Sequence, residues 1–168
     1  MPTHRLPILG VNTKPDESGF VFPEPYSVKA TNDKWKHLGF IFNDSGSRDG
    51  LSGMFTVPKG YVGTANLVLV WTAIITSGDL GWEFDYRAIG GDDSESFDQS
   101  TAQETIILTD TAPTSINLRL EKIASLTDGN FAVDDDVEFE IFRNKASSLD
   151  TLVGAGILKR LFFQYSDS

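Results

Sequence analysis

Pairs of carboxylates spaced two residues apart are the groups of this chain that could do acid–base chemistry. Glu83 and Asp85 alternate with aromatic residues in GWEFDYRAI, and Glu138 and Glu140 alternate with apolar residues in DVEFEIFRN. Successive side chains of a strand point to opposite faces, so each acidic pair shares one face. Two carboxyl groups across a cleft would permit glycoside hydrolysis. Because Arg and Lys stand beside them, we favour a solvated charged face and assign no catalytic residue.

Other residues that carry chemistry are scarce. The chain has no cysteine, which excludes disulfides, thiolate nucleophiles and Cys-based zinc sites. His4 and His37 lack metal-ligand spacing, and no GxSxG segment supports a Ser–His–Asp triad. Acidic loops offer oxygen ligands for calcium, but none matches the EF-hand pattern and Asp also favours turns. These loops hold Asn43, Asp44, Ser45 and Asp49; Asp92 and Asp93; and Asp134, Asp135 and Asp136. We expect no metal, no cofactor and no enzymatic activity.

Length and charge exclude several classes of protein. With 168 residues the chain has the size of one domain that can bury a core without cross-links. Its formal net charge is −10, whereas a nucleic-acid binder needs a basic face and anionic membranes repel acidic proteins. No apolar run reaches the roughly 20 residues of a spanning helix, and the N-terminus lacks a signal-peptide pattern. We expect a protein made in the cytoplasm that binds neither nucleic acid nor membrane.

The N-terminal segment is rich in proline, which resists both helices and central strands. Five of the seven prolines lie there: Pro2, Pro7, Pro15, Pro23 and Pro25. This pattern predicts an extended arm over residues 1–33, followed by the folded domain over residues 34–168. Such an arm is either a disordered tail or a segment that orders on a partner, and its apolar residues keep the second possibility open.

The domain reads as short β-rich runs separated by turn residues. The predicted strands cover residues 37–42, 53–57, 66–75, 81–89, 104–109, 115–124, 136–144 and 157–166. Several alternate cleanly; in residues 115–124, for example, Ile116, Leu118 and Leu120 share the predicted inward face. Eight strands at this spacing predict an all-β fold, an antiparallel eight-stranded jelly-roll β-sandwich with an extended N-terminal arm.

Three of these strands carry apolar residues on the face that should meet water. They are Val68, Val70 and Ile74 in LVLVWTAII, Phe142 in DVEFEIFRN, and Phe162 in ILKRLFFQY. A contiguous exposed apolar patch usually marks an interface, so these five residues are predicted to form a subunit contact. The alternative is that a long loop or the arm itself covers this face.

Exposed aromatic residues leave a different binding function open. Trp35, Tyr61 and Tyr86 are not all assignable to the core, so a carbohydrate-binding groove on the sandwich is possible. A groove with two or more coplanar aromatics would favour that function.

Two segments carry a resemblance to a known family. PKGYVGTANLVLVWTAIITSGDLGWEFDYRAI and DDDVEFEIFRNKASSLDTLVGAGILKRLFFQYSD, together roughly half of the chain, resemble small jelly-roll virion proteins of tailed phages. Asp136, where a Gly-Asp turn is usual, and the long Pro-rich arm depart from that pattern. The matching positions are Pro58, Leu67, Leu69, Trp71, Trp82, Arg143, Asp150, Leu152 and Tyr165.

The resemblance implies a bacteriophage structural protein on the capsid surface of the virion. Such a decoration or cement protein would bind the major capsid protein as a homotrimer and stabilise the shell. The arm would add capsid contacts through Leu6, Ile8, Leu9, Phe20 and Phe22. The alternative is a phage fibre or spike tip, or a module that binds a carbohydrate or receptor.

One ion pair follows from the register of a strand. Arg143 continues the inward series of Ile141, and a buried guanidinium needs an anionic partner. Asp150, seven residues further on, is the nearest candidate across a Ser-rich loop. We expect Arg143 and Asp150 to form a structural pair that holds this loop.

Overall fold

The computed structural model describes residues 1–10, 12, 20–29, 35–44, 48–90 and 95–168. Within these ranges the chain forms eleven β-strands and one short 3-10 helix, η1. Their bounds are β1 (Thr3–Pro7), β2 (Phe20–Val21), β3 (Glu24–Lys29), β4 (Lys36–Phe42), β5 (Arg48–Thr56), β6 (Tyr61–Ala73), β7 (Asp79–Ile89), β8 (Glu104–Thr111), β9 (Leu120–Ser125), η1 (Asp128–Asn130), β10 (Asp136–Arg143) and β11 (Gly156–Asp167).

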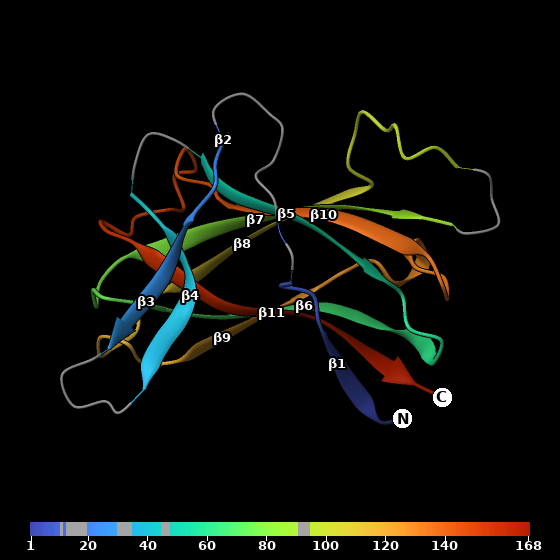
Figure 1. Ribbon diagram of the computed structural model, residues 1–168, viewed down its shortest axis with the longest axis horizontal. Coiled ribbons are helices and arrows are strands. Elements are labelled where there is room, and N and C mark those ends of the chain that lie inside the picture. The colour runs from blue at the N-terminus through green and yellow to red at the C-terminus, as the bar shows by residue number, and fades with distance from the viewer. Residues whose placement is uncertain (11, 13–19, 30–34, 45–47, 91–94) are drawn as a thin grey trace.

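The strands form two sheets that pack face to face (Figure 1). The β11 sheet has the order β3-β4-β11-β6-β9, and β1 also pairs with β11. The β10 sheet has the order β2-β5-β10-β7-β8. The pairs are antiparallel, except that the two-residue β2 runs parallel to β5. This confirms the predicted jelly-roll β-sandwich, and each of the eight predicted strands corresponds to one of β4–β11.

Aromatic side chains dominate the core between the sheets. The rings of Trp71 and Trp82, from opposite sheets, meet edge to face with centroids 6.2 Å apart. Phe84 and Phe139 stack within the β10 sheet at 5.5 Å. Complete burial of one such side chain contributes about 1.5–3 kcal/mol, so this layer is the main source of stability.

The described part of the predicted arm belongs to the sheets. β1 pairs with β11 from Thr3 opposite Ser166 to Pro7 opposite Phe162, and β3 pairs with β4 over six residues. Ile8, the residue after β1, is only 5% exposed, and its N–H donates to the carbonyl of Leu161 at 2.9 Å. The predicted boundary between residues 33 and 34 lies outside the described residues.

The residues predicted to contact a capsid are used within the chain where they are described. Ile8 is in the core, and Leu6, Leu9 and Phe22 pack against it. The side chain of Phe20 lies outside the description. Their role as capsid contacts stays a prediction, because a partner could reach most of them only if this segment left the sheets.

The five predicted interface residues do not share one face: Phe142 lies in the β10 sheet, whereas Val68, Val70, Ile74 and Phe162 lie in or next to strands of the β11 sheet. Long cationic side chains cover apolar residues on the outer faces of both sheets. Val68 and Val70 are 0% and 4% exposed. The guanidinium carbon of Arg5 lies 6.0 Å from the ring centroid of Phe162, and that of Arg48 lies 3.9 Å from the ring of Phe142. Arginine stems shield apolar surface while the charged head stays in water. Of the five predicted interface residues, Ile74 is exposed, at 48%. The subunit contact itself stays a prediction.

One predicted strand was wrong in its first half. β9 begins at Leu120, and residues 115–119 form a turn in which Asn117 has a φ of +63°. Asn tolerates this left-handed conformation, which ends the alternation. Ile116 and Leu118 are therefore exposed, at 60% and 46%, and not directed inward.

The predicted ion pair between Arg143 and Asp150 is present. Arg143 is 1% exposed, and its Nε and Nη2 atoms donate to the two carboxylate oxygens of Asp150, both at 2.8 Å. Two remaining donor directions are met by the carbonyls of Gly154 at 2.6 Å and Leu152 at 2.5 Å. The pair therefore holds the segment between β10 and β11 against the core.

Candidate ligand-binding cleft

Six outward side chains form two rows of three on the outer face of the β10 sheet. Strand pairing aligns Glu138 with Met54 of β5 on one side and with Arg87 of β7 on the other. Two residues further along β10, Glu140 is aligned in the same way with Ser52 and Asp85. These two rows cross three adjacent strands, so three carboxylates, one guanidinium, one hydroxyl and one thioether share a face.

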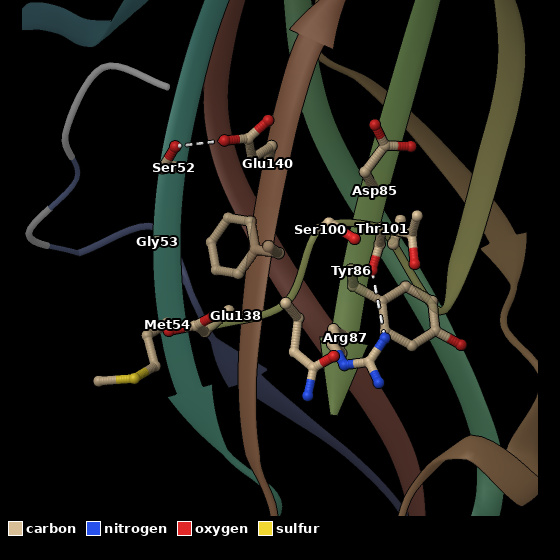
Figure 2. A pocket seen from close by; sticks show the side chains of 13 residues that line it. Ser52, Gly53, Met54, Asp85, Tyr86, Arg87, Ser100, Thr101, Glu138 and Glu140 are labelled. Carbon is tan, nitrogen blue, oxygen red and sulfur yellow. Dashed lines mark hydrogen bonds between the residues drawn. The ribbon is translucent and has the colours of Figure 1, made fainter. Parts of the chain in front are cut away.

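A loop after β7 builds one wall and turns this array into a cleft of about 540 Å³ (Figure 2). The wall consists of Gln99, Ser100, Thr101 and Ala102. Arg87 ties the loop to the sheet, because its Nη1 donates to the carbonyl of Thr101 at 3.2 Å. Residues 91–94 of the same connection lie outside the description. The volume falls in the usual range for small-molecule sites, about 300–1,000 Å³.

Two buried polar atoms at this cleft have no partner among the described residues. They are Oδ1 of Asp85, an acceptor, and Nε of Arg87, a donor. Leaving a buried charged group without its hydrogen bonds costs more than the ~1–3 kcal/mol of a neutral one. By contrast, Glu140 accepts a hydrogen bond from Ser52 Oγ at 3.1 Å, drawn in Figure 2. Asp85 Oδ1 and Arg87 Nε are shielded from solvent, so a ligand would reach these two atoms only if the side chains around them moved.

The electrostatics of the cleft are acidic. Three carboxylates and one guanidinium line it, giving a formal charge of −2. Burial, together with the nearby carboxylate of Asp85, raises the pKa of the neighbouring Glu83. An anionic ligand would be repelled here, whereas neutral hydroxyls can donate to carboxylates without that cost.

Of the two acidic pairs from the sequence, the structure brings Asp85, Glu138 and Glu140 together at one cleft. Glu83 lies one row further along β7, where its carboxylate is 3.8 Å from Arg48. The carboxylates thus stand on an outer face, as the solvated-face interpretation requires, but that face is hollowed. The loop wall and the residues of β5 were missed. Only the pairing of β5 with β10 reveals them, because no motif marks Ser52 or Met54.

The three aromatics proposed for a sugar groove do not form one. Trp35 is 70% exposed, whereas Tyr86 is 2% exposed in the core and its hydroxyl donates to Glu104. Tyr61 is half-buried against Phe131, with ring centroids 6.2 Å apart. A sugar in the cleft would therefore meet carboxylates, Arg87 and the exposed side chain of Met54, without a pair of coplanar rings.

Several acidic residues considered for calcium have other partners in the structure. Asp44 accepts from Lys145 at 2.5 Å, and the buried Asp49 accepts from the backbone N–H of Asn43. Asp135 accepts from the N–H of Ala132 at 2.7 Å. Ser45, Asp92 and Asp93 lie outside the described residues. Among the described residues, no group of three or more His, Cys, Asp or Glu side chains has a metal-binding arrangement.

His4 is not among the described residues that line the cleft. His4 Nε2 lies 3.4 Å from an Asp167 carboxylate oxygen, at the far end of the β1–β11 pair. His37 is on β4, and its side chain lies outside the description. No helix in the described part of the chain is long and apolar enough to cross a membrane.

Comparison with known proteins places the fold but not the function. No protein-family model and no curated protein matches the sequence. Among solved structures, an isomalto-dextranase of Arthrobacter globiformis T6 complexed with panose is similar over 96% of this chain and 23% of its own, with 13% identity and a TM-score of 0.50. The carbohydrate-binding module CBM27-1 of Caldicellulosiruptor saccharolyticus, in complex with mannohexaose, is covered completely, with 11% identity and a TM-score of 0.48.

A viral protein is also similar. A chain of infectious bursal disease virus, Gt strain, has 12% identity and a TM-score of 0.40, with 84% of this chain and 31% of that chain covered. The present chain thus spans less than a third of the viral chain and of the isomalto-dextranase. At such low identities the comparison establishes the β-sandwich alone.

Proposed function

We propose that this protein is a non-catalytic binding module of the jelly-roll type, which holds a neutral carbohydrate in the cleft on the β10 sheet. The observation that carries this proposal is the set of hydrogen-bonding side chains that lines the cleft: the carboxylates of Asp85, Glu138 and Glu140, the guanidinium of Arg87 and the hydroxyl of Ser52. A sugar hydroxyl is both donor and acceptor, so adjacent hydroxyls of one ring can bond to carboxylates and to donors on this face.

The surrounding residues extend this match. Glu138 and Glu140 supply further carboxylate acceptors, and hydrogen bonds to charged groups contribute about 1.5–3 kcal/mol each. Met54, which is 60% exposed, offers an apolar surface for the C–H groups of a sugar ring. The acidity of the cleft favours neutral sugars over uronic acids or sulfated sugars.

The fold is compatible with this proposal without carrying it. The structural neighbours include proteins named as carbohydrate-binding modules and one viral protein, and this sandwich supports many unrelated functions. The sequence resemblance to tailed-phage virion proteins provides a setting in which a glycan-binding module would recognise a host surface. Binding is the role we propose, and the three carboxylates act as hydrogen-bond acceptors.

Substitution of Asp85 tests the proposal. The wild-type protein is titrated calorimetrically with panose, mannohexaose and β-1,4-galactotriose, and screened on an array of neutral glycans. D85N keeps the side-chain shape but removes the charged acceptor, so we expect at least about ten-fold weaker binding of any glycan bound by the wild type.

An exposed glutamate on the other sheet provides the control. E24Q removes one carboxylate from β3, outside the cleft, and should bind glycans as the wild type does. Failure of every neutral glycan to bind the wild type, or equal binding by D85N, would contradict the proposal.

A second candidate function, capsid decoration by a homotrimer, is favoured by one exposed apolar region. The N–H of Asn117 donates to the carbonyl of Ala73 at 3.0 Å, which brings Ile116 and Leu118 beside the end of β6, where Ile74 is exposed. Large apolar residues that gather on a surface mark interfaces more often than scattered ones do.

Sedimentation tests this second candidate. If the region joins subunits, the wild-type protein sediments as a trimer at micromolar concentration and I74D shifts it towards the 18.5 kDa monomer. The matched variant V62D, at an exposed valine at the opposite end of β6, should leave the trimer intact. A monomeric wild type would remove the support for a decorating trimer.

A further inference from the structure

A second cleft, on the outer face of the β11 sheet, has the opposite charge. Its volume is about 520 Å³, and four cationic residues line it: Arg5, Arg119, Lys159 and Arg160. No acidic residue is among the lining residues, although the whole chain carries a formal charge of −10. A concentration of positive charge on so acidic a protein needs a physical reason.

Two of the cations are held in place by one carboxylate. Arg5 Nη2 and Arg119 Nη2 each donate to Glu121, both at 2.6 Å. Arg5 is also fixed by Gln164, whose Oε1 accepts from its Nε at 2.8 Å. Glu121 neutralises one positive charge of the group, so the cluster keeps a formal charge of +3. Because the two guanidinium groups are already ordered, a ligand would lose less side-chain entropy on binding them.

The other two cations have little to neutralise them. The Nζ atom of Lys159 is buried and has no hydrogen-bond partner among the described residues; its nearest aromatic contact is the ring of Tyr26, 5.8 Å away. Burial lowers the pKa of Lys159, as expected for an ammonium without an anion beside it. Arg160 is exposed and stands opposite Val70 in the strand pairing.

The cleft also has an apolar part. Val70 and Phe162 line it between the cations, and Asn117 and Thr72 add polar groups at the side of β9. A ligand that fits both features has a negatively charged group and a compact body with some apolar surface.

We infer that this cleft binds a compact oxyanion, a carboxylate, sulfate or phosphate group carried on a body the size of one or two sugar rings. At physiological ionic strength charges are screened over about 8 Å, so a ligand contained in the cleft feels mainly the local positive charge. A long polyanion such as duplex DNA would extend over the acidic remainder of the surface and be repelled.

This site is independent of the neutral-glycan cleft. The two lie on the outer faces of opposite sheets and share no lining residue. Loss of one activity therefore leaves the other measurable, and D85N should bind oxyanions as the wild type does.

Calorimetric titration with charged hexoses tests the inference. The probes are D-glucuronate, D-glucose 6-sulfate and D-glucose 6-phosphate, with D-glucose as the neutral control and inorganic sulfate as the bare anion. At low salt we expect saturable binding of at least one charged hexose, weakened by sodium chloride, and no comparable binding of D-glucose. Inorganic sulfate should bind more weakly, because it leaves the apolar part unfilled.

Two neutral variants and one control locate the site. R160Q and R119Q should each weaken binding by about two- to five-fold, the range for one exposed charge pair, with unchanged melting temperature for R160Q. K59Q, an exposed lysine in the turn before β6, should bind as the wild type does.

Three results would overturn the inference. They are binding of charged hexoses no stronger than of D-glucose, equal weakening by K59Q, or tighter binding of duplex DNA than of any charged hexose. Association of the protein with itself that charged hexoses do not displace would assign the cleft to a second copy of the chain instead.

Discussion

Arg143 shows how this fold accommodates a buried charge. A guanidinium at 1% exposure is stable only if its donors are met, and Asp150 together with the carbonyls of Gly154 and Leu152 provides the acceptors. Lys145 Nζ reaches the same carboxylate at 3.5 Å and Asp44 at 2.5 Å, which extends the network to the surface. The network joins β10 to the segment before β11, and none of its residues lines either cleft.

Removing the carboxylate of this pair should destabilise the protein strongly. D150N leaves Arg143 buried without its anion, and breaking a buried pair from one side costs about 3–5 kcal/mol. Urea denaturation measures the change in the free energy of unfolding. The half-buried pair between Lys122 and Asp110, 3.8 Å apart, is the control: K122M should cost no more than ~1 kcal/mol. Equal costs for the two variants would contradict this role of Asp150.

Register explains which residues the sequence could assign. Arg143 was placed inward from Ile141, and its partner was found by its distance along the chain. The cleft could not be predicted from the face of each residue alone, because Glu140 stands beside Ser52 and Asp85 only through the pairing of three strands. Hydrophobic alternation reports the face of a residue but not its neighbours on adjacent strands.

Among the secondary-structure elements, β1 extends the β11 sheet by pairing with β11. Its register places Arg5 on the outer face, where it reaches Glu121 of β9 across β11 and β6. Directly after β1, the side chain of Ile8 packs into the core. Proline and short apolar runs hid this strand in the sequence, because Pro suits an edge strand but breaks the pattern by which strands are recognised.

The ion pair between Arg5 and Glu121 should make the stability of the protein depend on pH. Hydrogen bonds from Arg5, and then from Arg119, lower the pKa of Glu121 from 4.5 to about 2. A carboxyl group whose pKa is lower in the folded state contributes its full stabilisation above pH 4.5 and loses it as the pH falls towards 2. The melting temperature of E121Q should therefore lie below that of the wild type at pH 6, with the gap closing by pH 2.

Salt provides the check on this cause. The ion pair is largely exposed, so 1 M NaCl should reduce the gap at pH 6 by screening. A gap that is the same at pH 6 and pH 2 would mean that Glu121 acts through packing and not through its charge.

The docking of β1 makes a second prediction at this scale. I8A removes a side chain that is 95% buried in the core, and such truncations cost about 2–5 kcal/mol in free energy of unfolding. Denaturant titration should show this loss, whereas V153A, at a position 79% exposed, should change stability by less than ~0.5 kcal/mol. A negligible effect of I8A would show that the segment is detached in solution.

At the scale of the molecule, the two sheets present faces of opposite character. The outer face of the β10 sheet carries an acidic cleft, and that of the β11 sheet carries a cationic one. The all-β class and the eight main strands followed from alternation and turn residues alone. The division of charge between the two faces could not be predicted from the sequence, because the overall charge of −10 conceals a local cluster of four cations.

This division also answers what covers the second face of β6. The sequence left Val68 and Val70 without a covering, and a second copy of the chain was one explanation. Arg5, together with Phe162 and its neighbours, covers that face within one chain, and Ile74 remains as the exposed apolar residue of the predicted set. A subunit contact, if it forms, would therefore centre on the end of β6.

Calorimetric titration of the wild type and D85N with neutral oligosaccharides is the decisive measurement for glycan binding in the cleft of the β10 sheet. We expect a saturable isotherm for the wild type with at least one neutral glycan, and at least about ten-fold weaker binding by D85N. E24Q should give the wild-type isotherm. Equal binding by the wild type and D85N, or no binding of any neutral glycan, would contradict the assignment of the cleft.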